Sequence, residues 1–163
     1  MIATAPGIPA RTLAAAKAEV EEIFRDAQVT VTWQQSGGDR ERSVTLRIVS
    51  LETAAGNPRT TMLGLAVRPR QSAFVFYNRI LEVTRGQAVD EGVLLGRVMA
   101  HEVGHVLLPP GGHSHYGLMR SDIDVDVTNP SRFTREQAAR IRETLTRFGM
   151  GDPTPGPPAT GRR

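Results

Sequence analysis

Two histidines four residues apart, inside an apolar stretch that a proline pair ends, constrain this chain more than any other feature. The run His101-Glu102-Val103-Gly104-His105 places both imidazoles on one face of a helix, where they can bind a single metal ion. The stretch before it begins at Asp90, a residue typical of helix N-caps, and is apolar on most sides. Pro109-Pro110-Gly111-Gly112 prevents the helix from continuing past Leu108. We therefore predict a central, buried helix that carries a metal-binding motif.

The turn after this helix can return a third histidine to the metal. His113 follows His105 by eight positions, and His115 is an alternative that would point elsewhere if this stretch is extended. Three protein ligands and one open position are typical of a catalytic zinc site. The chain contains no cysteine, which excludes the usual sulfur-rich structural zinc site, although other divalent metals remain possible. Glu102, next to the first ligand, is the candidate general base for a water that the metal polarises.

Length and composition indicate one globular domain. A chain of 163 residues with 39% hydrophobic residues can bury a single core. No apolar run approaches the length that spans a membrane, so no membrane partner is expected. The N-terminus lacks the basic and apolar regions of a signal peptide, and the absence of cysteine fits any redox compartment.

The basic isoelectric point does not by itself indicate nucleic-acid binding. The pI is about 10.1, but the net charge is only +3, and 19 of the 20 basic residues are arginine. These arginines are scattered, and together with abundant Ala, Gly and Pro they resemble a coding bias more than a phosphate-binding surface. We expect no nucleic-acid partner.

Hydrophobic periodicity predicts a single α+β unit. An amphipathic helix is expected over residues 9–27 and a last helix from Thr134 to Gly149, with Thr134 and Gln137 at capping-box spacing. Strands are expected over 29–33, 44–49, 62–67 and 73–77, separated by a turn at 37–39 and a loop at 56–58, and the most apolar of them, 73–77, should lie centrally. The domain is expected to span 9–149, with a disordered Pro/Gly-rich tail over 150–163.

The last helix has a clear apolar face. Ala138, Ile141, Leu145 and Phe148 recur at helical spacing and are expected to be buried. Phe133, just before the predicted N-cap, and Ala138 have the spacing of a hydrophobic staple.

The segment HEVGHVLLPPGGHSHYGLM, residues 101–119, resembles the zincin superfamily of metallopeptidases, and within it a compact, metzincin-like bacterial protein. The resemblance covers about an eighth of the chain, plus the order of the upstream elements. Two positions depart from the metzincin pattern: Leu108 stands at the glycine position and Gly111 at the third-ligand position. His113 is the natural replacement ligand, and Met119 is either the counterpart of the methionine turn or an ordinary core residue.

The resemblance implies a zincin-like fold, in which a small mixed twisted sheet packs on the N-terminal and motif helices. It implies one catalytic zinc ion bound by His101, His105 and His113, with Glu102 as the general base in peptide-bond hydrolysis. We expect an endopeptidase rather than an exopeptidase, acting as a monomer on a peptide or protein substrate. A secreted or periplasmic location is favoured by the resemblance alone.

Three further segments have candidate roles beside plainer interpretations. An acidic run over 122–126 can orient a ligand histidine or bind calcium, but it fits a solvated loop better. Tyr116 can assist oxyanion stabilisation, although a packed loop tyrosine is the plainer interpretation. The strand predicted over 62–67 can offer its edge to an extended peptide.

Several alternative functions remain open. Zinc ribonucleases with three spaced histidines fit the basic pI, but Glu102 and the wide spacing to His113 argue against them. Peptide deformylases share the motif but need a cysteine ligand, which the chain lacks. A gluzincin-like site would take its third ligand from Glu136 or Glu143 of the last helix. A metal-binding domain without proteolytic activity remains the main alternative.

Overall fold

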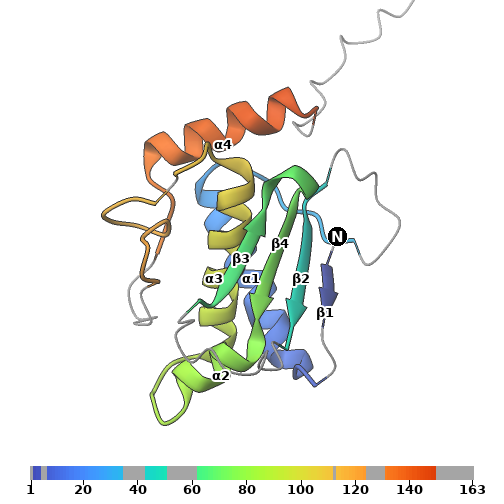
Figure 1. The fold of residues 1–163 in the computed structure, drawn as a ribbon, viewed down its shortest axis with the longest axis vertical. Coiled ribbons are helices and arrows are strands. Elements are labelled where there is room, and N and C mark those ends of the chain that lie inside the picture. Colours follow the sequence, from blue (N-terminus) through green and yellow to red (C-terminus); the bar gives the residue numbers. More distant parts are fainter. Residues whose placement is uncertain are drawn as a thin grey trace, which may run out of the picture.

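The computed structural model describes residues 2–4, 7–34, 43–50, 62–111, 113–123 and 131–149. These residues form a mixed α+β unit with one four-stranded sheet: β1 (Ile2–Thr4), β2 (Thr45–Val49), β3 (Gly64–Val67) and β4 (Ser72–Phe76). The strand order is β1-β2-β4-β3, with β1, β2 and β4 parallel and β3 antiparallel to β4. The antiparallel strand β3 therefore lies at one edge of the sheet (Figure 1).

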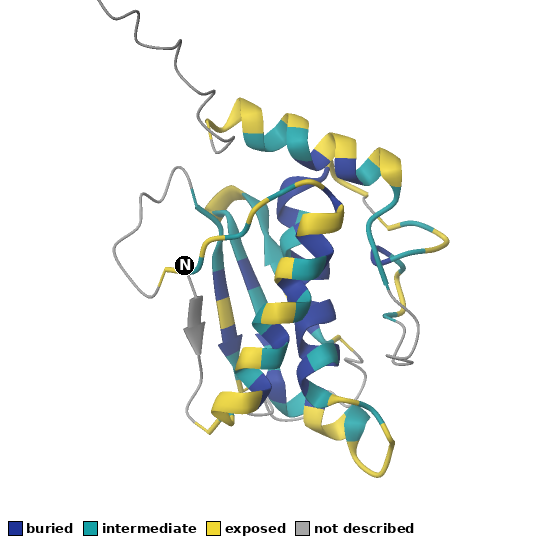
Figure 2. Ribbon diagram, turned by 180° about the vertical axis from the view of Figure 1, so that it is seen from behind, coloured by how far each residue is buried: buried dark blue, intermediate teal, exposed yellow. Residues whose placement is uncertain are grey.

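Four α-helices accompany the sheet: α1 (Ala10–Asp26), α2 (Tyr77–Thr84), α3 (Glu91–Leu107) and α4 (Arg135–Arg147). Helices α1 and α3 pack against each other on one face of the sheet, and α3 also contacts β3 and β4 (Figure 1). Helix α4 runs across the end of this layer, and its outer side is exposed while α3 is almost entirely buried (Figure 2). The predicted α+β class and the central, buried motif helix are confirmed.

Local sequence explains both ends of α3. The Asp90 carboxylate accepts a hydrogen bond from the Val93 amide at 3.0 Å, which satisfies one of the free amides of the first turn. The helix ends at Leu107, with Leu108 as its C-cap, because Pro109 and Pro110 cannot continue it.

Two glycines of α3 bring it close to α1. A Cβ at Gly96 would lie 2.6 Å from the Ala16 carbonyl oxygen, and one at Gly92 would lie 2.6 Å from the Ala15 Cβ. Larger residues at these positions would force the two helices apart, so the glycines set the close packing that buries α3.

The predicted strands are largely confirmed. Strand β4 lies between β2 and β3, with Ala73 and Val75 buried, as expected for the most apolar segment. Leu46 and Ile48 of β2 point into the same core. Strand β3 begins at Gly64 rather than at residue 62.

The predicted strand over 29–33 is wrong. Gln28 adopts a positive φ of 61°, and the chain then runs extended, with Val29, Val31 and Trp33 half-buried and Thr30 and Thr32 exposed. Burial therefore alternates as the sequence pattern predicts, but the segment pairs with none of the described strands, and both sides of β2, the strand that follows it, are taken by β1 and β4. An alternating pattern indicates that one side of an extended chain is buried. It does not by itself indicate that the chain is hydrogen-bonded to a neighbouring strand.

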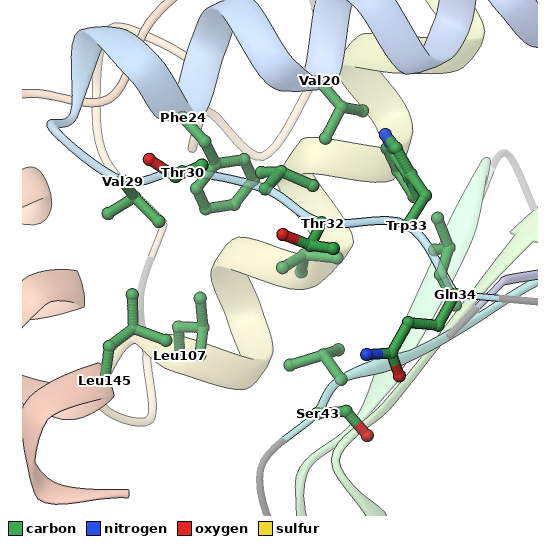
Figure 3. Close-up of a pocket in the computed structure, with 14 residues that line it drawn as sticks. Val20, Phe24, Val29, Thr30, Thr32, Trp33, Gln34, Ser43, Leu107 and Leu145 are labelled. Carbon is green, nitrogen blue, oxygen red and sulfur yellow. The ribbon is translucent and has the colours of Figure 1, made fainter. Parts of the chain in front are cut away.

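This extended segment forms one wall of a half-open cavity of about 390 Å³ (Figure 3). The other walls come from α1, the start of β2, the last turns of α3 and Leu145 of α4. None of the residues that line the cavity carries an ionisable group. The cavity therefore offers apolar surface but no acid, base or metal ligand.

One strand and one α-helix of the described residues, β1 and α2, were not predicted from the sequence. Strand β1 pairs with β2 and lies before the range 9–149 that the sequence indicates for the domain. Helix α2 has only eight residues, and its first residue, Tyr77, was predicted from the sequence as the end of the preceding strand. The predicted turn at 37–39, the loop at 56–58 and the tail over 150–163 lie outside the described residues.

Helix α4 has the predicted capping box. The Thr134 hydroxyl accepts from the Gln137 amide at 3.2 Å, and the Gln137 side chain accepts from the Thr134 amide at 2.9 Å. Ala138 and Ile141 are buried, but the expected burial of Phe148 is wrong, since its side chain is 41% exposed at the free end of the helix.

Candidate metal centre

Three histidines meet at the C-terminal end of α3. His105 Nε2 lies 3.0 Å from His101 Nε2 and 3.1 Å from His113 Nε2. His101 and His105 come from successive turns of α3, and His113 comes from the loop that follows the proline pair. The structure thus brings together the three histidines that the sequence singled out, and one metal ion can be held among them.

The distances from His105 Nε2 to the other two nitrogens fit a tetrahedral metal ion. Ligand nitrogens at the usual zinc distance and tetrahedral angles are about 3.3 Å apart. The observed separations of 3.0 and 3.1 Å are close to that value. His101 is also correctly oriented, because its Nδ1–H donates to the Leu118 carbonyl at 2.8 Å and so leaves the Nε2 lone pair free for a metal.

Burial favours the neutral form of the two helix imidazoles, those of His101 and His105. Desolvation lowers the pKa of His101, although its hydrogen bond to Leu118 acts in the opposite direction. Desolvation, together with the neighbouring His101, His113 and Arg68, lowers the pKa of His105 to about 4. A neutral imidazole is the form that binds metal, so the site is prepared for a cation at neutral pH.

Glu102 lies under the edge strand. Its side chain is only 6% exposed, and burial raises its pKa to about 7. A Cβ at Gly64 of β3 would lie 2.5 Å from the Glu102 Cγ and 2.7 Å from its Oε1. Gly64 therefore provides the space that the carboxyl group occupies, and a glycine inside a strand often marks such a close approach.

The loop after α3 is held in place from two sides. The Arg68 Nη2 donates to the Pro109 carbonyl at 2.7 Å, next to the point where the helix ends. On the other side, Met119 is fully buried against Gly104, where a Cβ would lie 2.6 Å from the Met119 sulfur. Gly104 therefore lets the loop that follows α3 approach the helix closely.

His115 is exposed and does not belong to the histidine cluster. The cluster among the described residues consists of His101, His105 and His113. Glu136 and Glu143, the gluzincin-like alternatives, pair instead with Arg140 and Arg147 on the surface of α4.

Asp122 fits the preferred interpretation of a solvated loop, because its side chain is exposed and pairs with Arg120, while the Leu118 carbonyl holds the His101 ring. One minor prediction requires correction: Tyr116 is not packed, since 71% of it is exposed. Asp124 and Asp126, the rest of the predicted acidic run, lie outside the described residues.

Sequence reasoning did not identify the Leu118 carbonyl or Arg68 as parts of this region. A backbone carbonyl has no sequence signature, and Arg68 is one of many scattered arginines. The close approach at Gly64 had a signal, namely a glycine within an apolar strand, but its partner Glu102 is distant in sequence.

Within the described part of the chain, no helix is both long and apolar enough to cross a lipid bilayer. No protein-family model and no curated protein matches this chain.

Proposed function

We propose that this protein is a zinc-dependent metallopeptidase that hydrolyses internal bonds of peptide or protein substrates. The observation that carries the proposal is the convergence of three imidazoles immediately beside Glu102, a buried carboxyl group against an edge strand. Three nitrogen ligands leave a fourth position for water or substrate, which is the arrangement of catalytic rather than structural zinc.

His101, His105 and His113 would hold the zinc ion. Zinc in such a site supplies Lewis-acid chemistry, because it lowers the pKa of water and polarises a carbonyl oxygen. Glu102 is the residue that moves protons: its carboxylate accepts a proton from the attacking water and returns it to the leaving amine nitrogen. A pKa raised to about 7 suits both transfers near neutral pH.

Strand β3 supports a peptide as the substrate. Among the described residues, β3 pairs with β4 on one side and with no strand on the other. An extended peptide can add to that free edge through main-chain hydrogen bonds. Because Gly64 of β3 contacts Glu102, a peptide bound along this edge would lie next to the proposed base.

The test compares the zinc-loaded wild-type protein with Glu102→Gln on a diverse peptide pool, with cleavage followed by mass spectrometry. We expect equal zinc content and a cleavage rate reduced by about 10²- to 10⁴-fold, since glutamine has the same shape but cannot accept the proton. Glu136→Gln on the exposed surface of α4 is the matched control and should cleave normally. Equal cleavage by wild type and Glu102→Gln would reject the general base, and zinc binding with no cleavage by wild type would favour the non-proteolytic alternative.

A further inference from the structure

Arg132, just before α4, contacts three carboxylates of α1. Its Nη1 lies 3.4 Å from Glu19 and its Nε lies 2.5 Å from Asp26, and its Nη2 bonds to Glu22. Glu19 also lies 3.5 Å from the buried Arg97 of α3. Several charges in one network can fix a side chain far better than an isolated surface ion pair can.

The backbone of Arg132 continues this connection to a metal ligand. Its carbonyl accepts a hydrogen bond from the Leu118 amide at 2.8 Å, and the Leu118 carbonyl accepts from His101 Nδ1 at 2.8 Å. Gly117, with φ of 77°, allows this approach, because a Cβ there would lie 2.7 Å from the Arg132 carbonyl oxygen. Two hydrogen bonds thus separate Arg132 from the imidazole ring.

The next residue packs the same segment between α1 and α3. The Phe133 ring contacts the Phe24 ring of α1 edge to face, with centroids 5.2 Å apart. On its other side, Phe133 and Met119 lie against Gly104 of α3. The segment that holds Leu118 is therefore attached to α1 by both charge and packing.

We propose that Arg132 is a positioning residue for the metal centre. The carboxylates of Glu19, Glu22 and Asp26 hold its guanidinium, which fixes the carbonyl that binds Leu118. Leu118 in turn holds the His101 ring with Nε2 directed at the other two histidines. Partners that orient a ligand histidine typically change metal affinity by 10- to 100-fold. This inference rests on the proposed metal centre.

The test measures zinc affinity by competition with a chelator, and ligand geometry from the visible absorption of the cobalt-substituted protein. Arg132→Met should bind zinc about tenfold more weakly and change the cobalt bands, because the His101 ring is held less firmly. Arg132→Lys should be intermediate, since a single ammonium cannot satisfy three carboxylates in the way a guanidinium does.

Arg142→Met is the matched control. Arg142 is also a half-buried arginine, and it donates to the Ala27 carbonyl at the end of α1, but among the described residues no hydrogen bond or ion pair joins it to the loop that carries Leu118. Its loss should lower stability and leave zinc affinity and the cobalt spectrum unchanged. This comparison separates positioning from a general loss of packing.

The partners on α1 provide a second set of variants in case Arg132→Met does not fold. Glu22→Gln with Asp26→Asn changes residues 75 or more positions away from His101 in sequence, yet should weaken zinc binding in the same direction. Combined with Arg132→Met, the pair should add little further loss, since all three residues act through one interaction.

A measurement on the metal-free protein tests the positioning role of Arg132 separately from the existence of the metal centre. In the metal-free protein, Arg132→Met should accelerate hydrogen exchange of the Leu118 amide. Unchanged zinc affinity and cobalt bands in the folded variants would overturn the positioning role and leave the proposed centre intact. Failure of the wild type to bind zinc would overturn the proposed centre, and this inference with it.

Discussion

At the scale of single residues, two neighbouring ionisable groups of α3 lie where burial disfavours their charged forms. Glu102 and His101 follow each other in α3, both are buried, and burial favours the neutral form of each. For the carboxyl group this means a raised pKa, and for the imidazole a lowered one. Such opposed shifts are common where a protein binds a cation or moves a proton.

The cost of burying Glu102 predicts a pH-dependent effect of Glu102→Gln in the metal-free protein. A carboxyl group with a pKa of about 7 in the folded state and 4.5 in the unfolded state stabilises the fold least when it is ionised. Its contribution is intact below pH 4.5 and is lost as the pH rises through 7. Glu102→Gln should therefore be more stable than wild type by about 3 kcal/mol at pH 8, with little difference at pH 4. Chemical denaturation with a chelator present measures both values, and a pH-independent difference would contradict the prediction.

Gly104→Ala tests the close contact between α3 and the ligand loop. Alanine improves helix propensity by about 1 kcal/mol. Its Cβ would, however, lie 2.6 Å from the Met119 sulfur and 2.9 Å from the Phe133 ring, both of which are packed. We expect a net loss of about 1–3 kcal/mol in unfolding free energy, as for other overpacked cores. A gain in stability would mean that Met119 can move aside at no cost.

At the scale of elements, α3 is the component on which the rest is assembled. It packs on α1, β3 and β4, and its final turns carry two of the three histidines. Its first turn is held by a side-chain cap, while its last turn is followed by a loop that Arg68 and Met119 hold in place. Changes at the first turn should therefore affect stability more than metal binding.

Asp90→Ala tests this division. Loss of the N-cap should lower the unfolding free energy by about 1 kcal/mol, because the Val93 amide loses its partner. Zinc affinity of the folded protein should not change, since the cap lies eleven residues before His101. Urea denaturation and zinc titration check the two parts, with exposed Asp122→Ala as the control that changes neither.

At the scale of the whole molecule, metal binding and folding should be linked. The three histidines come from α3 and from a loop that the unfolded chain does not hold near the helix, so zinc binds the folded state preferentially. Protons compete for the same nitrogens, and because the pKa of His105 is lowered to about 4, its competition with zinc in the folded protein should become strong only as the pH falls towards that value.

Zinc should therefore raise the melting temperature of the protein. At a free zinc concentration 100 times the dissociation constant, the added stability is about 2.7 kcal/mol. His113→Ala should lose most of this increase, because it removes one of three ligands, whereas His115→Ala should keep it, since His115 is exposed and outside the cluster. Differential scanning calorimetry with and without zinc measures the difference. The opposite ranking of the two variants would exchange the roles of His113 and His115.

Local patterns in the sequence were sufficient to predict helices α1, α3 and α4, strands β2 and β4, and the three histidines. The caps at Asp90 and Thr134 and the spacing of His101 and His105 depend on residues within one or two helical turns. Such features follow from nearby residues, so the sequence alone could determine them.

Only the tertiary structure decided which residues meet across long distances in the chain. The extended segment 29–33 has the pattern of a strand, yet the positions beside β2 are occupied by β1 and β4. The Leu118 carbonyl that orients His101, the Arg132 contacts with α1 and the space that Gly64 leaves for Glu102 join residues far apart in sequence. Pairing and close packing depend on competition among all the elements at once, and no local pattern records the outcome of that competition.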